Sequence, residues 1–420
     1  MVIASIDIQG AKVVQLRQGS ELVLQYDDAA ALIKEFDRYG EVAVIDLDAA
    51  QGGADNTALI KSLLRQAQCR VGGGIRTVSQ ACELLSWGAQ KIIIGSRAFR
   101  DSVTGRFKLN TEFLADLAEK IGRERLIIAL DSRGEDIVID GWKTVTTLPL
   151  IETAQEAAHF AGELLWTCVE REGTMTGIDM ALALRLRTAL ECRLTVAGGV
   201  ASLAEIEQLA ALGCDVQLGM ALYTGAVSLA DAFVCCLNWN KAPLLPVIAQ
   251  SPDGQVLMTG FADKEAVSAT FKLGKLCFHS RSRDSLWMKG EKSGNTLDLI
   301  RLHADCDRDA LLATVSPTGP VCHTGAYSCF VTSRRYTLEY LQEIIAERFR
   351  TSPSDSYTAT LNDERVRRKL MEEAYELCTA STHDEQVWEA ADLFFFATAL
   401  ITRAGITVEE VLNELARRHK

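Results

Sequence analysis

Two glycine-rich segments, VGGGIR at residues 71–76 and VAGGV at residues 196–200, decide the fold of the first 240 residues. Each segment begins with the end of a short aliphatic run, and Gly73 and Gly198 lie 125 residues apart. A glycine directly after a strand lets the backbone turn sharply toward the next helix. The matched spacing indicates an internal repeat, in which two similar halves form one domain.

Other strand ends repeat at nearly the same offset. Asp7 and Asp131 lie 124 residues apart, as do Gly95 and Gly219. Eight short aliphatic runs alternate with helical stretches: Val2 to Ile6, Val42 to Leu47, Gln68 to Val71, Lys91 to Ile94, Leu126 to Leu130, Leu164 to Thr167, Arg193 to Val196 and Asp215 to Leu218. This alternation predicts a (β/α)₈ TIM barrel over residues 1–240, with a doubly wound open sheet as the alternative fold.

Small residues at the strand ends predict two phosphate-binding cradles, because glycine lets backbone N–H groups approach an anion closely. These residues are Gly73, Gly74, Gly95, Ser96, Gly198, Gly199 and Gly219. A substrate with a phosphate at each end would then lie between Asp7 and Asp131, which could act as general base and general acid. The alternative is that the aspartates only cap helices and the glycines only form turns.

Several segments of the barrel resemble the phosphoribosylformimino-AICAR-phosphate isomerase family. They are Ser5-Ile-Asp-Ile, Val71-Gly-Gly-Gly-Ile-Arg76, Ile94-Gly-Ser96, Ala129-Leu-Asp131, Gly141-Trp142 and Gly219-Met-Ala-Leu-Tyr223. The resemblance implies an Amadori rearrangement of an aldose to a ketose, with Asp7 as base, Asp131 as acid and Thr167 assisting.

The barrel departs from this family at four positions. Gln15 stands where the family has Arg, and Ser20, Cys168 and Glu172 stand where Asp is typical. These departures leave a second hypothesis open, in which the barrel is catalytically silent and serves as a scaffold.

The composition limits the remaining possibilities. A chain of 420 residues exceeds what one core usually organises, which predicts two or three domains. The net charge of −12 argues against nucleic-acid binding, and neither a signal peptide nor a membrane-spanning run is apparent, which predicts a cytoplasmic protein with no membrane partner. In such a compartment the 12 cysteines are expected to stay reduced, so a clustered subset would more typically bind metal.

Residues 241–335 predict a small β-rich α+β domain, which begins after the break marked by Pro243 and Pro246. The expected strands are Leu244 to Ser251, Val256 to Phe261, Leu276 to Ser280, Ser285 to Lys289 and Thr296 to Ala304.

This domain contains soft and hard metal ligands side by side. Cys306, Cys322 and Cys329 form a candidate zinc set with one open coordination position for a water. In an extended segment Asp305, Asp307 and Asp309 would project to one face, where they could bind Mg²⁺. The alternative is a set of structural cysteines beside a solvated acidic turn.

The same residues resemble phosphoribosyl-AMP cyclohydrolase. The resemblance includes Phe278-His-Ser-Arg-Ser-Arg283, Leu286-Trp-Met-Lys-Gly290, Glu291-Lys-Ser-Gly-Asn295 and Cys322-His323 followed by Cys329. It implies that zinc activates a water to open the adenine ring, with His323 as a proton shuttle. It also implies a homodimer that completes the zinc site, and phosphate contacts from Arg281, Arg283 and Lys289.

Residues 336–420 predict an all-α domain with helices at Tyr336 to Phe349, Asp363 to Thr379 and Asp384 to Ala404. Five carboxylates at helical spacing could converge between the last two helices: Glu372, Glu373, Glu376, Glu389 and Asp392. Such crowding favours Mg²⁺, although exposed helix acids without a cation are the alternative.

The Glu-Glu-x-x-Glu and Glu-x-x-Asp pair resembles the all-α nucleoside-triphosphate pyrophosphohydrolases, and Glu389-Ala-Ala-Asp-Leu-Phe is most similar to the phosphoribosyl-ATP branch. The resemblances name three successive steps of histidine biosynthesis, with phosphoribosyl-ATP and phosphoribosyl-AMP as substrates and Zn²⁺ and Mg²⁺ as cofactors. A pyrophosphatase for ordinary nucleoside triphosphates is the alternative for the last domain.

Overall fold

The computed structural model describes residues 1–53, 56–101 and 107–418. It divides into two compact units, Met1–Gln250 with Leu257–Val321, and Ser251–Val256 with Cys322–Lys420. The predicted boundaries at residues 240 and 335 differ from this division and stay a prediction.

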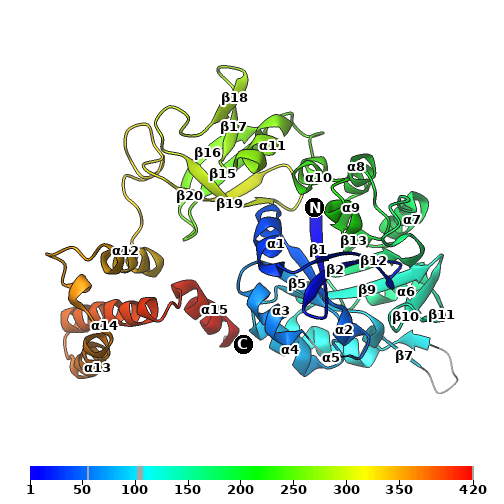
Figure 1. Cartoon of the computed structure of the whole chain (residues 1–420), viewed down its shortest axis with the longest axis horizontal. Helices are drawn as coiled ribbons and strands as arrows, with labels where there is room; N and C mark the ends of the chain where they lie inside the picture. Colours follow the sequence, from blue (N-terminus) through cyan, green and yellow to red (C-terminus); the bar gives the residue numbers. More distant parts are fainter. Residues whose placement is uncertain (54–55, 102–106, 419–420) are drawn as a thin grey trace. The chain divides into compact units, whose positions relative to one another are not determined.

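The predicted eight-stranded barrel is confirmed (Figure 1). Its parallel strands, in order around the barrel, are β1 (Val2–Gln9), β4 (Val42–Asp46), β5 (Cys69–Gly72), β6 (Lys91–Ile94), β9 (Leu126–Arg133), β12 (Glu163–Cys168), β13 (Arg193–Ala197) and β14 (Asp215–Leu218). Pairing of β6 with β9 and of β14 with β1 closes the ring. Strands β1 and β9 therefore lie on opposite sides of the barrel, as do β5 and β13.

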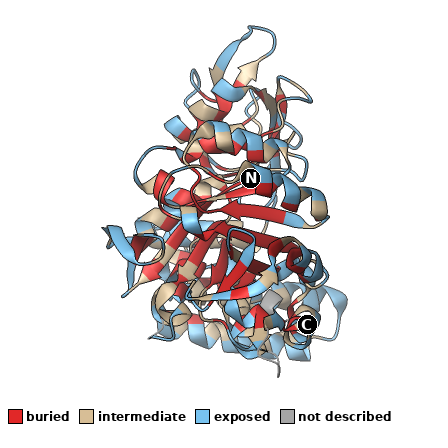
Figure 2. Cartoon of the chain, turned by 90° about the vertical axis from the view of Figure 1, so that its right-hand side faces the viewer, coloured by how far each residue is buried: buried red, intermediate tan, exposed pale blue. Residues whose placement is uncertain are grey.

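Helices between these strands cover the outside of the barrel (Figure 1). They are α1 (Ala29–Phe36), α3 (Thr57–Leu64), α4 (Val78–Ser86), α5 (Thr111–Ile121), α6 (Leu150–Ala157), α7 (Met180–Ala189), α8 (Leu203–Ala211) and α10 (Leu229–Cys236). Two short helices, α2 (Leu47–Ala50) and α9 (Met220–Tyr223), lie instead at the barrel mouth, where their residues line a cavity. Burial concentrates on the barrel strands, whose aliphatic side chains form the core (Figure 2).

The internal repeat extends to helix capping. Thr77 forms a capping box with Gln80 at the start of α4, and Ser202 forms one with Glu205 at the start of α8. Each box satisfies backbone N–H groups that a helix start leaves without partners. Both helices therefore begin in the same way directly after a glycine segment.

The sequence analysis did not predict two hairpins of the barrel. Strands β2 (Lys12–Arg17) and β3 (Glu21–Tyr26) extend from β1, and β10 (Asp136–Ile139) and β11 (Thr144–Pro149) extend from β9. A short pair, β7 (Phe99–Asp101) and β8 (Phe107–Leu109), follows β6. The first two hairpins occupy equivalent places in the two halves, at the mouth of the barrel.

The β-rich module contains a four-stranded sheet in the order β16 (Val256–Ala262), β15 (Leu245–Gln250), β20 (Leu311–Pro317) and β19 (Leu297–Ala304). Helix α11 (Lys264–Leu273) and the hairpin β17 (Cys277–Ser280) and β18 (Ser285–Met288) complete it. The sequence analysis predicted neither strand β20 nor helix α11. The ring of Phe271 on α11 stacks on Tyr39 of the barrel at a centroid distance of 4.3 Å.

The C-terminal module is helical, as predicted. It consists of α12 (Leu338–Thr351), α13 (Asp363–Thr379), α14 (His383–Arg403) and α15 (Val408–Arg418). Its core contains Leu341, Ile345, Leu361, Val366, Phe396 and Ala399. Within the described ranges no single helix is long and apolar enough to cross a membrane; α14 joined to Val408–Leu415 meets that criterion only as a pair bent by 110°.

Candidate active sites

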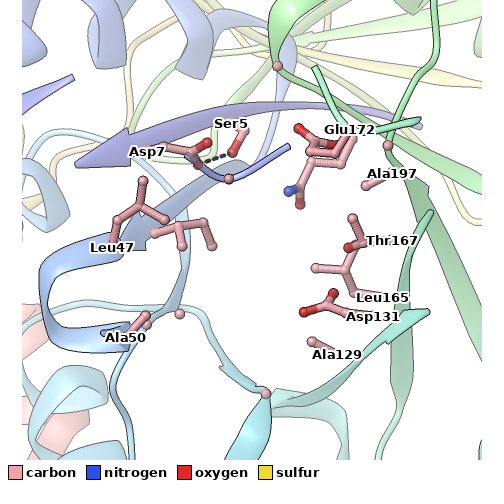
Figure 3. Close-up of a pocket in the computed structure, with 18 of the residues that line it drawn as sticks. Ser5, Asp7, Leu47, Ala50, Ala129, Asp131, Leu165, Thr167, Glu172 and Ala197 are labelled. Carbon is pink, nitrogen blue, oxygen red and sulfur yellow. Dashed lines mark hydrogen bonds between the residues drawn. The ribbon is translucent and has the colours of Figure 1, made fainter. Parts of the chain in front are cut away.

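A cavity of about 270 Å³ lies in the barrel mouth, at the carboxyl ends of the strands (Figure 3). Every barrel residue that the sequence predicted for catalysis or phosphate binding lines it: Asp7, Asp131, Thr167, Gly73, Gly74, Gly95, Ser96, Gly198, Gly199 and Gly219. Active sites of (β/α)₈ barrels lie at this end because the βα loops converge there.

Asp7 enters this cavity from β1. The Ser5 hydroxyl donates a hydrogen bond of 2.8 Å to its Oδ1 (Figure 3). Burial raises the pKa of Asp7 from 3.8 to about 6, and the Ser5 hydrogen bond opposes that rise. The carboxylate is therefore ionised at neutral pH yet basic enough to accept a proton.

Asp131 faces the same cavity from β9, on the opposite side of the barrel. The indole Nε1 of Trp142 donates to its Oδ2 at 2.8 Å. Burial raises the pKa of Asp131, and hydrogen bonds from Trp142 and Thr167 oppose that rise. A carboxyl group that retains its proton more readily suits a general acid.

Glu172 is a third carboxyl group in the cavity, and the sequence analysis gave it no role. It follows β12, and burial together with the charges of Asp7 and Asp131 raises its pKa from 4.5 to about 8. Two acids, Glu170 and Glu172, follow this strand within a few residues, so sequence alone did not show which one enters the mouth.

The glycines of the predicted phosphate cradles are needed for different reasons. Gly73 has a φ of +100° and Gly198 one of +91°, and a Cβ at either position would lie within 2.6 Å of a backbone oxygen, that of Asp46 or of Cys168. The turn itself therefore requires these two glycines. At Gly95 a Cβ would meet no atom within 4 Å, so this backbone is open to a ligand.

Three departures from the isomerase pattern occupy different surroundings. Gln15 is buried, its Oε1 lies 2.9 Å from where a Cβ on Gly219 would be, and its Nε2 donates to Val14 O at 3.0 Å. Ser20 is exposed, whereas Cys168 is buried at the end of β12. Of these three, Gln15 is the one whose side chain lies against a predicted cradle residue, whereas Cys168 meets Gly198 through its backbone.

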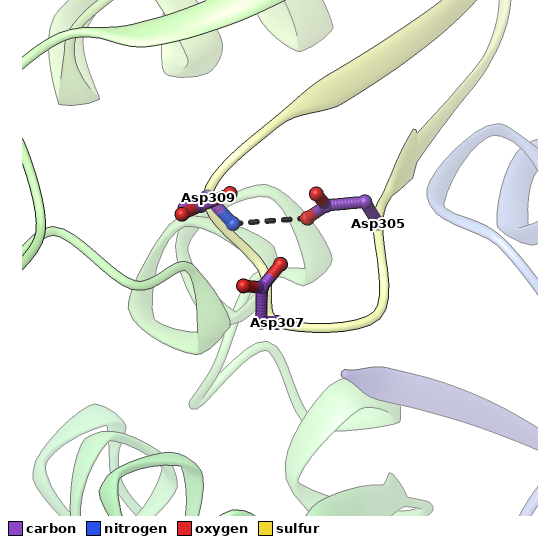
Figure 4. Close-up of side chains that lie close together, drawn as sticks. All are labelled: Asp305, Asp307 and Asp309. Atoms are coloured by element: carbon purple, nitrogen blue, oxygen red, sulfur yellow. Dashed lines mark hydrogen bonds between the residues drawn. The ribbon is translucent and has the colours of Figure 1, made fainter.

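The acidic residues of the β-rich module do come together, but not as predicted. Residues 305–310 form a turn between β19 and β20 instead of an extended segment, and Arg308 has a φ of +63°. The turn brings carboxylate oxygens of Asp305, Asp307 and Asp309 within 4.8 Å of one another (Figure 4). Curvature of the chain, and not the alternation of a strand, gathers them.

The predicted thiolates are divided between the two units. Cys306 is an exposed residue of the first unit, whereas Cys322 and Cys329 belong to the second. A hydrogen bond of 3.2 Å from the Thr324 hydroxyl lowers the pKa of Cys322, and Cys329 contributes in the same direction. His323 is exposed, with Nδ1 at 3.8 Å from the Cys322 sulfur.

The predicted phosphate contacts of this module lie near aromatic rings. The Arg281 guanidinium lies 4.0 Å from the ring centre of Phe261, and that of Arg283 lies 5.9 Å from Trp287. Lys289 is largely buried. Their proposed contacts with phosphate stay a prediction.

The helical carboxylates form two overlapping groups, Glu372 with Glu373 and Glu376, and Glu373 with Glu389 and Asp392. Within each group, ligand oxygens lie within 4.8 Å of one another. Buried Glu373 belongs to both. Desolvation, followed by the charges of Glu376 and Glu373, raises the pKa of Glu389. The predicted convergence between α13 and α14 therefore exists.

Three family models match successive segments of the chain. The model described as histidine biosynthesis protein matches residues 1–228, phosphoribosyl-AMP cyclohydrolase matches residues 258–331, and phosphoribosyl-ATP pyrophosphohydrolase matches residues 338–419. This order is the one that the sequence analysis predicted.

Among known proteins, similar chains are named histidine biosynthesis bifunctional protein HisIE. The one from Vibrio vulnificus (strain YJ016) is 38% identical over 197 residues, which is 44% of this chain and 93% of the relative. That from Escherichia coli (strain K12) is 40% identical over 194 residues, 44% of this chain and 96% of the relative. The chain belongs to the histidine biosynthesis protein family through its barrel, and carries a phosphoribosyl-AMP cyclohydrolase and a phosphoribosyl-ATP pyrophosphohydrolase domain after it.

Proposed function

We propose that this hydrolase carries out three successive reactions. The helical domain converts phosphoribosyl-ATP to phosphoribosyl-AMP and diphosphate, and the cyclohydrolase domain opens the adenine ring of that product. The barrel then isomerises the resulting aldose to a ketose. The domain order supports the two hydrolytic steps, because each product is the substrate of the domain that precedes it in the chain.

In the helical domain, Glu372, Glu373, Glu376, Glu389 and Asp392 would hold Mg²⁺. Their converging oxygens fit a hard cation, which prefers carboxylates and accompanies polyphosphate substrates. Bound Mg²⁺ would neutralise the diphosphate that leaves. Buried Glu373, common to both groups, would fix the arrangement.

In the cyclohydrolase domain, Asp305, Asp307 and Asp309 would hold Mg²⁺, and their clustered oxygens fit it. The proposal that Cys306, Cys322 and Cys329 bind zinc rests on the sequence, supported by the lowered pKa of Cys322, since a metal binds the thiolate. Zinc would acidify a water for attack on the adenine ring. His323 would move protons during that attack.

For the barrel, one observation carries the proposal: two partly buried carboxyl groups, Asp7 and Asp131, face one cavity from opposite strands. Asp131 would donate a proton as the sugar ring opens, and Asp7 would remove the proton from carbon 2. Thr167, which hydrogen-bonds to Asp131, would hold that carboxyl in place. The cradles around Gly95 and Gly219 would bind the terminal phosphates.

A silent barrel is the second hypothesis, and Gln15 favours it. This neutral side chain lies beside Gly219, where the isomerase pattern has a cationic arginine. Loss of that charge would weaken phosphate binding and could abolish turnover.

The test gives full-length protein phosphoribosyl-ATP with Mg²⁺ and Zn²⁺ and follows the intermediates by mass and ultraviolet absorbance. Conversion through to the ketose supports all three reactions. Accumulation of the aldose would show a silent barrel, and absence of diphosphate release would contradict the central proposal. A Gln15→Arg variant measures what the missing arginine costs.

A further inference from the structure

The acidic turn at residues 305–309 is held in place by the barrel. It lies against the amino-terminal ends of the barrel strands, at the face opposite the mouth, where Asp215 begins β14 and Met1 precedes β1. This face of a (β/α)₈ barrel ordinarily serves stability and not catalysis. Here it contacts the loop that carries three candidate metal ligands.

Arg308 makes the main contact. It stands between Asp307 and Asp309 in the chain, and its guanidinium donates to Cys214 O and to Asp215 Oδ1, both at 3.0 Å. Its side chain is 14% exposed, and that of Asp215 is 4% exposed. A charged pair so well removed from water fixes geometry more firmly than a surface pair does.

The segment after the last barrel helix also contacts the turn, through hydrogen bonds and ion pairs. The backbone N–H of Asn238 donates to Arg308 O at 2.8 Å, and its side-chain amide donates to Asp307 O at 3.4 Å. The Lys241 ammonium pairs with Asp307 and lies 2.8 Å from Asp309 Oδ2. The barrel thus supplies an anchor for the backbone of the turn, and Lys241, directly after the barrel, supplies a counter-charge for its carboxylates.

We infer that Arg308 is a positioning residue of the cyclohydrolase, through which the barrel shapes the acidic turn for a divalent cation. The inference rests on the proposed cation site. It gives the barrel a function that does not depend on its own catalysis, because Arg308 acts at the face away from the isomerase cavity. Lys241 is the neutralising charge that a bound cation displaces.

The test compares Arg308→Met with wild type in the full chain, stripped of metal and carrying Glu373→Gln to weaken the helical site. Mn²⁺ binding is followed by electron paramagnetic resonance. Loss of a group that supports metal ligands typically costs about 10- to 100-fold in affinity or activity. We expect a loss of that size in Mn²⁺ affinity and in kcat of ring opening, with partial rescue by Arg308→Lys.

Arg193→Met is the matched control. Arg193 also pairs with Asp215, at 2.6 Å, but its side chain is 56% exposed and belongs to the barrel. It should leave Mn²⁺ affinity unchanged. If Arg308→Met fails to fold, Lys241→Met still tests the inference, since removing a competing cation should tighten Mn²⁺ binding.

The variants distinguish three outcomes. If Asp307→Asn binds Mn²⁺ as the wild type does, the turn holds no cation and the proposed site fails. If Asp307→Asn loses the ion while Arg308→Met retains both affinity and kcat, the cation site stands and the positioning role is overturned. Unchanged Mn²⁺ affinity in Lys241→Met would equally contradict the counter-charge role.

Discussion

The barrel mouth and the helical module both crowd carboxyl groups, yet by different means. In the barrel, Asp7, Asp131 and Glu172 line the cavity at the mouth, where desolvation raises all three pKa values. In the helical module, Glu372 and Glu376 are exposed, and Lys369 Nζ lies 2.8 Å from Glu372 and 2.9 Å from Glu373. Burial without a counter-charge favours protonation, whereas converging oxygens open to solvent favour a cation.

The largest expected effect concerns the carboxyl groups of the barrel mouth. Asp7→Asn removes the proposed base while keeping the shape of the side chain, so isomerisation should fall by roughly 10²- to 10⁴-fold. The rate of ketose formation from purified aldose measures it. Diphosphate release by the same preparation serves as the internal control, and an unchanged isomerisation rate would remove Asp7 from the mechanism.

The helical side is tested at Glu373. Glu373→Gln should weaken Mg²⁺ binding and lower diphosphate release by about 10- to 100-fold, because it takes a charge from both carboxylate groups. Titration of activity with Mg²⁺ measures the shift. Glu364→Gln, an exposed acid in the first turn of the same helix, is the matched control. Equal Mg²⁺ dependence in both variants would argue against the cation site.

The pH dependence of isomerisation sharpens the contrast. Asp7 acts as a base only when ionised, so kcat/KM should fall about tenfold for each pH unit below its raised pKa of about 6. Ser5→Ala removes a hydrogen bond that lowers this pKa, and should move the acid limb to higher pH. A limb near the ordinary pKa of an aspartate in both proteins would contradict burial as the cause.

The smallest effect concerns stability. Burial raises the pKa of Glu172 from 4.5 to about 8, so the folded state holds a proton that the unfolded state releases, and stability falls as the pH rises through that window. Glu172→Gln should therefore melt a few degrees higher than wild type at about pH 8.5, at roughly 2–4 °C per kcal/mol. The two melting temperatures should converge below the unfolded pKa. A constant difference across pH would point to a packing effect instead.

The sequence predicted more of the barrel than of its surroundings. Aliphatic runs and the offsets of 124 and 125 residues predicted all eight barrel strands and the carboxylates and glycines at their ends, which line the cavity together with Thr167, named through the family resemblance. The hairpins β2–β3 and β10–β11 went unpredicted because each extends a barrel strand through a tight turn, and the outer strand of each, β3 or β11, is largely exposed.

The acidic turn shows the limit most clearly. The spacing Asp305, Asp307, Asp309 indicated a cluster, but a period of two suggested an extended segment where the chain instead turns at Arg308. The role of Arg308 could not be read locally, because its partner Asp215 lies 93 residues away in the chain. Similarly, the sequence indicated that Trp142 lies on a loop but did not show that its indole donates a hydrogen bond to Asp131.

The sequence by itself determined which residue types recur at which spacing, and hence the barrel, the helical carboxylates and the family of each segment. Periodicity and short motifs are local properties, so they can be read directly from the order of the residues. Only the tertiary structure decided that Glu172 shares a cavity with Asp7 and that Arg308 of the acidic turn pairs with Asp215 of the barrel. Both depend on burial and on contacts between distant segments, which arise when the strands close into a ring.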